Sequence, residues 1–322
     1  MSRVTGIVMA VAITLAVAVP LAQADTFPTK QIRMTIPLGP GSPTDAYARV
    51  MARQMEKQMG QPIVVENLPG AAGIIGTRTL VRAAPDGYTI GLISNGYVSH
   101  HLTSNEVQYR WPQDFLLVHQ GVDAQETVLV STKTPVKTLP ELVAYAKANP
   151  GKLNIGDPGS FTSPHIISEM FQYVTGVKFT QVTYKTSAEM IQALHRGEID
   201  LTFVTAATLP AGVTAGTWRG VALLRDTRSP GLPDIPTAKE QNVNLSYKLW
   251  LGFALPKGTP QDIADRWTKE AETALASAEV KKFLDEQKMI AIGGTKADMQ
   301  RSIDEEMDAL KNLIEVAKIP KM

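Results

Sequence analysis

Two glycine-containing loops carry the residue types that bind an anion without covalent chemistry. The first loop, Leu38-Gly-Pro-Gly-Ser-Pro-Thr-Asp45, follows an apolar run and enters a stretch that we expect to be helical as far as Met59. Ser42 suits the N-cap, Pro43 suits the first helical position, and Asp45 completes a capping box. Glycine lets a ligand approach the backbone, and the free N–H groups of a helix N-terminus favour an anion. By itself, this loop is equally compatible with an ordinary strand-to-helix turn.

A second loop repeats this logic in the middle of the chain. Residues 154–165 also follow a predicted strand, contain Pro-Gly-Ser at 158–160, and enter a helix through Ser163 and Pro164. Two such loops in two predicted domains indicate one ligand held across a cleft. Neither loop has a Lys or Arg before its helix, and phosphate usually attracts more positive charge. We therefore expect a carboxylate ligand, with Lys185 either adding charge or lying in solvent.

The elements that would position these loops predict an α/β protein, because short β-rich runs alternate with helical stretches. The helix starts include a capping box at Thr138–Glu141 and the pair Thr259-Pro260. The expected strands are Ile32–Pro37, Ile63–Glu66, Thr89–Ile93, Thr127–Ser131, Lys152–Ile155, Asp200–Val204, Gly220–Leu224 and Trp250–Leu255. Most of these strands should be parallel.

Two segments of the chain are predicted to cross between domains. Gln120–Pro135 and Ser246–Pro260 each place a strand next to irregular chain. Two crossings divide the chain into lobe 1, residues 25–124 plus 250–322, and lobe 2, residues 125–249. A cleft between two lobes is where a small ligand usually binds.

The first 24 residues predict a secretory signal peptide. Arg3 precedes an apolar run from Val4 to Ala22, and Ala22-Gln-Ala24 offers a cleavage point after Ala24. A membrane anchor is the alternative, since the run is nearly long enough to span a bilayer. Export to the periplasm would lower the supply of ATP and NAD, and so disfavours a cofactor-dependent enzyme.

Composition excludes further classes of function. The chain has 322 residues, with 32 Lys and Arg against 31 Asp and Glu, and removal of Arg3 leaves the charges in balance. A neutral chain lacks the electrostatic footprint of a nucleic-acid binder. Cysteine is absent, which excludes disulfides, thiolate metal sites and cysteine nucleophiles.

Sequence blocks from about Phe27 to the C-terminus resemble the Bug-type, TctC-like solute receptors of tripartite tricarboxylate transporters. The blocks follow the family's order and comprise Pro37–Asp45 with Ala48-Arg49, Gly60–Gly70 with Gly73 and Gly76, Ala84–Thr89, Ala148–Gly156, Tyr184-Lys185, Gly197–Asp200, Arg228–Thr237 and Trp250–Pro260. This resemblance implies a two-lobed, type II-like periplasmic binding protein without enzymatic activity or a cofactor. Such a receptor closes on a small carboxylate and delivers it to integral membrane transporter subunits, and we expect it to be a monomer.

In the family, one carboxylate of the ligand is held between the two strand-to-helix loops. The candidate ligand-binding residues are Leu38, Gly39, Pro40, Gly41, Ser42, Thr44, Asp45, Ser94, Asn95, Asp157, Gly159, Ser160, Phe161, Thr162, Ser163, His165, Lys185 and Thr205. His165 either contacts the ligand or braces its loop. Asp157 departs from the small residue usual in relatives, and either caps the loop or repels an anion unless turned away. Phe161 and Tyr97 could form an apolar wall.

Other classes of function remain as alternatives. Gly39-x-Gly41-x-x-Thr44 after a strand weakly resembles a dinucleotide-binding loop, but Pro40, Pro43 and the missing third glycine argue against that interpretation. No Gly-x-Ser-x-Gly nucleophile elbow occurs. His165 and Glu169 have the i,i+4 spacing of two metal ligands, too few for a site by themselves. A receptor for sensing, with a membrane signalling partner, would share the same binding chemistry.

Overall fold

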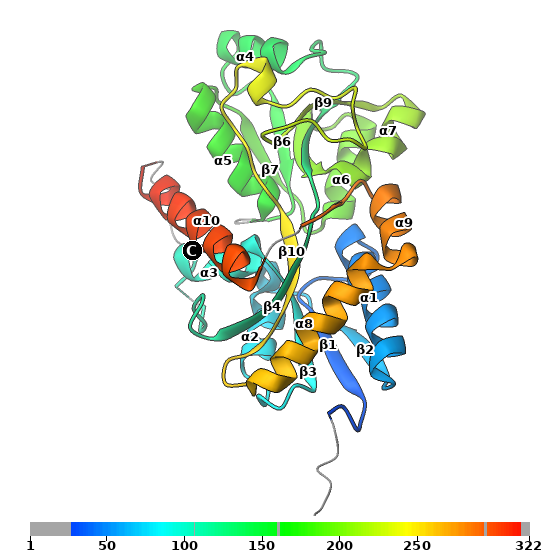
Figure 1. The fold of residues 1–322 in the computed structure, drawn as a ribbon. Helices are drawn as coiled ribbons and strands as arrows, with labels where there is room; N and C mark the ends of the chain where they lie inside the picture. Colours follow the sequence, from blue (N-terminus) through cyan, green and yellow to red (C-terminus); the bar gives the residue numbers. More distant parts are fainter. Residues whose placement is uncertain (1–26, 106, 160–161, 293–294, 317–322) are drawn as a thin grey trace, which may run out of the picture.

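The computed structural model describes residues 27–105, 107–159, 162–292 and 295–316. The predicted signal peptide with its cleavage point, and the candidate residues Ser160 and Phe161, lie outside these ranges. Figure 1 shows two lobes, each built on one sheet with helices on its faces. In the described part of the chain, no helix is long and apolar enough to cross a membrane.

The first lobe contains a six-stranded sheet assembled from both ends of the described chain. In sheet order its strands are β11 (Ile290–Ala291), β4 (Phe115–Asp123), β10 (Trp250–Pro256), β3 (Thr89–Ser94), β1 (Ile32–Ile36) and β2 (Ile63–Asn67). Its helices are α1 (Pro43–Met59), α2 (Ile74–Val81), α3 (Asn95–Thr103), α8 (Gln261–Ala276), α9 (Ala278–Glu286) and α10 (Lys296–Val316), with the short 3₁₀ helix η1 (Ala71–Gly73). β10 thus lies in the middle of this sheet although it comes late in the chain.

The second lobe contains a five-stranded sheet formed by consecutive elements. In sheet order its strands are β7 (Thr180–Thr183), β6 (Asn154–Asp157), β8 (Leu201–Thr205), β5 (Glu126–Ser131) and β9 (Trp218–Leu223). Its helices are α4 (Leu139–Ala148), α5 (Ser163–Thr175), α6 (Ser187–Arg196) and α7 (Leu209–Ala215), with the 3₁₀ helices η2 (Ala206–Thr208) and η3 (Lys239–Gln241).

The two-lobed α/β class is confirmed, but both sheets are mixed rather than mainly parallel. The strands that carry helices after them, such as β1 and β6, pair in parallel with their neighbours. β10 runs antiparallel to β3 and β4, and β5 runs antiparallel to β8 and β9. The antiparallel pairs arise because these strands join the lobes directly and are not part of βαβ units.

The first connection between the sheets is shorter than the sequence indicated. β4 continues through Gln120 to Asp123, and only Ala124 and Gln125 separate it from β5. We expected irregular chain at Gln120, and that expectation was wrong because Gln120 pairs with Gly252 of β10. The second connection, residues 224–249, lies beside the first, since the Ala124 nitrogen donates to the Leu249 oxygen at 2.8 Å. The lobe boundaries remain a prediction.

Apolar side chains form separate cores on the two sheets. Met34, Met51 and Trp267 belong to the core of the six-stranded sheet, and Phe171 and Phe203 belong to that of the five-stranded sheet. The ring of Tyr247, in the second connection, packs against both of these cores. Tyr247 is therefore a mechanical link between the lobes.

Candidate functional site

The first glycine loop is held from within by a carboxylate. Gly41 has a φ of 90°, and its nitrogen donates to Asp45 Oδ2 at 3.0 Å. The same carboxylate accepts hydrogen bonds from Arg49 Nε at 3.1 Å and Asn67 Nδ2 at 2.8 Å. Asp45 is 4 % exposed. Its charge is thus used to position the loop backbone.

The electrostatics of Asp45 agree with this structural role. Burial alone would raise its pKa, but hydrogen bonds from Arg49, Asn67 and Gly41 outweigh burial and lower the pKa of the carboxyl below its usual value. Arg49 Nη2 also donates to Asn67 Oδ1 at 2.7 Å, and Asn67 Nδ2 donates to the Leu38 oxygen at 3.1 Å. The loop from residue 38 to residue 45 is therefore fastened at several points to α1 and β2.

Ser42 caps α1 as the sequence predicts. Its Oγ accepts a hydrogen bond from the Asp45 nitrogen at 3.1 Å, and the helix ends at Gly60 in the left-handed conformation. The returning contact of the capping box goes to the Gly41 nitrogen, one residue before the cap. At Thr138, which accepts from the Glu141 nitrogen at 3.3 Å, the acid likewise reaches back to the Lys137 nitrogen.

In the second loop a buried aspartate also accepts a hydrogen bond from the backbone nitrogen of a loop glycine. Asp157 ends β6 with a fully buried side chain, and its Oδ1 accepts a hydrogen bond from the Gly159 nitrogen at 2.8 Å. Its Oδ2 accepts from Gln181 Nε2 at 2.6 Å and from Thr183 Oγ1 at 3.3 Å. Of the two roles considered for Asp157, the structure shows the capping role. The carboxylate therefore faces donors of its own loop and of the neighbouring strand β7.

Both loops leave open space at their glycines. A Cβ built on Gly39, Gly41 or Gly159 would have no atom of the described residues within 4 Å, apart from its chain neighbours. By contrast, a Cβ on Gly76 would lie 2.6 Å from Pro37 Cα, so Gly76 allows α2 to pack against the base of the first loop. The loop glycines are thus accessible to a ligand, whereas Gly76 is a packing residue.

Candidate residues from both lobes meet at Tyr247. Burial raises the pKa of the Tyr247 phenol, and the side chains of Ser163 and Asn95 beside it act on this pKa in the opposite direction. Ser163 is the first residue of α5 in the second lobe, and Asn95 is the first residue of α3 in the first lobe. Asn95 Nδ2 also donates to the Lys248 oxygen at 2.8 Å. Tyr247 therefore joins one candidate residue from each lobe.

The other candidate residues lie at helix starts or on the surface. Thr162 precedes α5, and its Oγ1 donates to the Gly159 oxygen at 2.7 Å, while His165 is half-buried in the first turn. Ser94 precedes α3 and is buried. Lys185 is exposed in the turn before α6, and its backbone nitrogen donates to the side chain of Glu189. Pro40 is exposed, Thr44 is half-buried in the first turn of α1, and Thr205, also half-buried, ends β8.

Sequence reasoning assigned no role to the residues that support the two carboxylates. Asn67 lies beside Ile36 in the parallel register of β1 and β2, and Thr183 lies beside Asp157 in that of β6 and β7. The carboxyl ends of neighbouring parallel strands lie at one sheet edge, so correct strand pairing would have identified both. Arg49 at i+4 from Asp45 was a local signal on one helix face.

Buried acids surround the connections between the lobes. Burial, assisted by the charge of Asp123, raises the pKa of Glu126 to about 8. Asp123 pairs with Arg225 Nη1 at 2.6 Å, although burial raises the pKa of this carboxyl as well. Burial raises the pKa of Glu306 to about 7, opposed by a hydrogen bond from Trp250 Nε1 at 2.7 Å. Among the residues described, no group of three or more His, Asp or Glu side chains could hold a metal ion.

Comparison with known proteins places this architecture in one family. A sequence profile described as the tripartite tricarboxylate transporter family receptor matches residues 47–319. A UPF0065 protein of Bordetella pertussis is 34% identical over 303 residues, which cover 92% of each chain. The BugT protein of the same organism is 30% identical over 284 residues, covering 87% of this chain and 86% of BugT.

Solved structures show the same similarity. A periplasmic transporter is 31% identical with a TM-score of 0.84, and the periplasmic binding protein BugD is 27% identical with a TM-score of 0.83. An R. palustris protein solved with adipate is 28% identical with a TM-score of 0.84. Each similarity covers 92% of this chain and 100% of the other. Sequence profile, relatives and fold agree, and the chain belongs to the receptor family of the tripartite tricarboxylate transporters.

Proposed function

We propose that this protein is a periplasmic receptor that captures a small carboxylate between its two lobes and delivers it to integral membrane subunits of a tripartite tricarboxylate-type transporter. The observation that carries the proposal is the matched construction of the two loops. Each loop has an accessible glycine of positive φ, anchored by a buried aspartate and followed by a helix N-terminus. Such backbone suits the binding of an anion without a covalent step.

The chemistry of the loops favours a carboxylate over a phosphate. Arg49 is the nearest arginine in the sequence to the first loop, and its guanidinium is bound to Asp45 and Asn67. Backbone and hydroxyl donors therefore bind the anion, which suits a planar anion with a single negative charge. The R. palustris relative solved with adipate, a linear dicarboxylate, supports this ligand class. A dicarboxylate would place one carboxylate on the loops and extend the other toward the rest of the cleft.

Binding would be coupled to closure of the lobes. The two loops belong to different sheets, and the chain joining the sheets is as short as Ala124 and Gln125 in the first connection. If only the closed arrangement brings both loops to one anion, the ligand has a higher affinity for that arrangement and shifts the population toward it. No bond is made or broken, so the proposed activity is capture and release.

A thermal-shift screen of the protein from Asp25 onward against linear and branched mono-, di- and tricarboxylates tests the proposal. A ligand that binds only the folded state raises the Tm, with about 2.7 kcal/mol of stabilisation at a ligand concentration of 100 times Kd. The fully amidated form of each active acid is the matched control, because it keeps the carbon chain and removes the charge. Stabilisation by the amides alone, or by cationic ligands alone, would contradict the proposal.

The transporter partner needs a separate experiment. A pull-down from a membrane fraction, with and without the carboxylate found in the screen, should retain multi-span transporter subunits in a ligand-dependent manner. If a membrane signalling protein is retained in place of transporter subunits, the proposed role changes from uptake to sensing. The proposed binding chemistry stays the same.

A further inference from the structure

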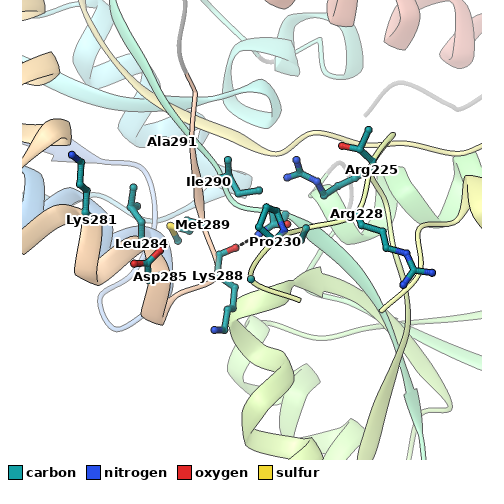
Figure 2. A pocket seen from close by; sticks show the side chains of 14 residues that line it. Arg225, Arg228, Pro230, Lys281, Leu284, Asp285, Lys288, Met289, Ile290 and Ala291 are labelled. Atoms are coloured by element: carbon teal, nitrogen blue, oxygen red, sulfur yellow. Dashed lines mark hydrogen bonds between the residues drawn. The ribbon is translucent and has the colours of Figure 1, made fainter. Parts of the chain in front are cut away.

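A cavity lies between the lobes, and no residue of the two glycine loops is among those that line it. Its volume is about 740 Å³, within the usual range of small-molecule sites. One wall is the loop Arg225–Gly231, which follows β9 of the five-stranded sheet. The other wall is formed by α9, β11 and the turn between them, in the six-stranded sheet (Figure 2). Below, this cavity is called the rear pocket.

Sheet order places the rear pocket and the glycine loops on opposite sides of the connecting strands. In the six-stranded sheet, β11 flanks β4 on one side, whereas β1 lies beyond β10 on the other. In the five-stranded sheet, β9 flanks β5 on one side, whereas β6 lies beyond β8 on the other. The glycine loops follow β1 and β6, so the rear pocket is separate from the proposed carboxylate cleft.

The rear pocket contains buried polar atoms without partners within the described part of the chain. Ser229 and Gln125 both line it and are each 1 % exposed. The Ser229 Oγ and Gln125 Oε1 atoms have no hydrogen-bonding partner among the described residues, and neither has Arg225 Nε. Buried polar groups in native proteins are nearly always paired, and a ligand in the rear pocket would supply partners for these three atoms. Other buried polar atoms without partners in the described chain, such as the Tyr47 hydroxyl, lie outside the pocket.

The backbone around the rear pocket is strained as well. Gln125 and Lys288 have φ angles of 47° and 56°, in the left-handed region that non-glycine residues rarely adopt. Gln125 Nε2 donates to the Lys288 oxygen, so the two strained residues hold each other across the lobes. Strain of this kind is retained mainly where function requires it.

The lining chemistry identifies the class of ligand. Lys281 and Lys288 supply positive charge, and Asp285 is the one acidic lining residue in the described chain. The guanidinium of Arg225 is paired through Nη1 with Asp123, so Arg225 offers its Nε as a hydrogen-bond donor. Figure 2 shows Arg225 reaching toward Ile290, whereas Arg228 extends away from the pocket centre, where it is engaged by Glu240. Leu284, Met289, Ile290 and Pro230 provide an apolar wall. Cationic and apolar surfaces side by side fit an organic anion with an apolar body.

We propose that the rear pocket is a second binding site, which takes a small organic anion with an apolar body and contacts it with residues of both lobes. The Ser229 hydroxyl and Arg225 Nε bind the anionic head from the second lobe, Lys288 faces it from the first lobe, and the apolar body lies against Leu284 and Met289. The site does not depend on the carboxylate cleft for its recognition.

Octanoate below its micellar concentration is the probe. Calorimetry on the protein should show saturable one-to-one binding, and backbone NMR shifts should fall on residues 229–231 and 284–291 and spare residues 39–42. The variants Lys288→Met and Ser229→Ala, one from each wall, should each lower the affinity for octanoate at least fivefold. Lys282→Met is the matched control, because Lys282 lies on α9, which forms part of the same wall as Lys288, but is outside the lining and near Glu286.

The same experiment includes one control for folding and one for the charge of the ligand. Ser229→Ala removes a hydroxyl without a partner in the described chain, so its Tm without octanoate should be unchanged. The neutral analogue octanamide should not bind. Equal octanoate affinity in Lys288→Met, Ser229→Ala and Lys282→Met overturns the proposal, as do NMR shifts confined to residues 39–42 or binding of inorganic phosphate with octanoate inert.

Discussion

The Oδ1 atom of Asp157 accepts a hydrogen bond from the backbone nitrogen of Gly159 at 2.8 Å. The first loop has the same arrangement, with Asp45 accepting from the Gly41 nitrogen at 3.0 Å. In each case an acid near the proposed anion site is turned inward, and its lone pairs are occupied by donors of its own lobe. A negative charge can thus lie beside an anion site because it organises donors and does not face the ligand.

Replacement of Asp157 by Asn should destabilise the second lobe. The Asn amide would direct an N–H toward either Gly159 or Gln181, both of which now donate to the carboxylate. The expected loss is about 1–3 kcal/mol in the free energy of unfolding, measured by urea denaturation. The exposed Asp234 provides the matched control, since Asp234→Asn should lie within about 0.5 kcal/mol of the parent. Equal stability of the two variants would refute the capping role.

Gly159→Ala should impair carboxylate binding with little effect on folding. Gly159 has a φ of 121°, and an Ala side chain there would meet no atom of the described part of the chain but would disfavour this backbone conformation. The Asp157-anchored nitrogen should move, and we expect at least a tenfold loss of affinity in calorimetry for a carboxylate found in the screen. Gly176→Ala, at a φ of 71° in similarly open space at the end of α5, should keep the parental affinity. Comparable affinity losses in both variants would point to general strain.

Glu126→Gln should flatten the dependence of stability on pH. Burial raises the pKa of Glu126 in the folded state to about 8, above the ordinary value of 4.5 that applies when unfolded. Between these values the folded state holds a proton that the unfolded state has released, so stability falls as pH rises. Glutamine removes this loss, and at pH 8 the variant should be more stable by a few kcal/mol at most, an order-of-magnitude figure.

The measurement for Glu126 is urea unfolding of both proteins from pH 4.5 to pH 9. Part of the slope should persist in the variant, because burial also raises the pKa of Glu306 to about 7. Parallel stability curves for parent and Glu126→Gln would show that the carboxyl is ionised throughout.

The variants Tyr247→Phe and Tyr247→Ala should distinguish the contribution of the ring from that of the hydroxyl. The ring packs against the cores of both sheets, and the phenol interacts with Ser163 and Asn95. Phenylalanine keeps the ring, so stability should fall by about 1 kcal/mol, while carboxylate affinity drops as the α3 and α5 termini lose a common partner. Alanine should cost about 3–5 kcal/mol by calorimetry. Similar stability of both variants would show that the ring is not a link between cores.

Apolar patterning in the sequence was sufficient to predict most strands but not all. All eight expected strands lie within two residues of the observed bounds, because apolar and β-branched residues dominate most of them; they are β1, β2, β3, β5, β6, β8, β9 and β10. β4 was missed since His119 and Gln120 interrupt its pattern, and its bulged pairing with β10 exists only in the folded sheet. β7 is a short, largely polar strand at the edge of its sheet, and its few side chains give no periodic signal.

The candidate site was predictable in its local parts only. The cap at Ser42 and the position of Asp45 follow from residue types on one helix. The partners Asn67 and Gln181 come from other strands, so their contacts depend on register, which one sequence does not determine. The role of Tyr247 could not be predicted for a related reason, because its neighbours Ser163 and Asn95 lie in different lobes.

The central position of β10 also sets the order in which the molecule can fold. β10 lies between β4 and β3, so a ribosome-bound chain that ends before residue 250 has a three-stranded partial sheet, β3-β1-β2, and a β4 without either of its partner strands. Pairings across such long sequence separations form slowly. The six-stranded sheet of a newly made chain should therefore stay open until the last quarter of the chain emerges, whereas the five-stranded sheet has all its strands once β9 has been made.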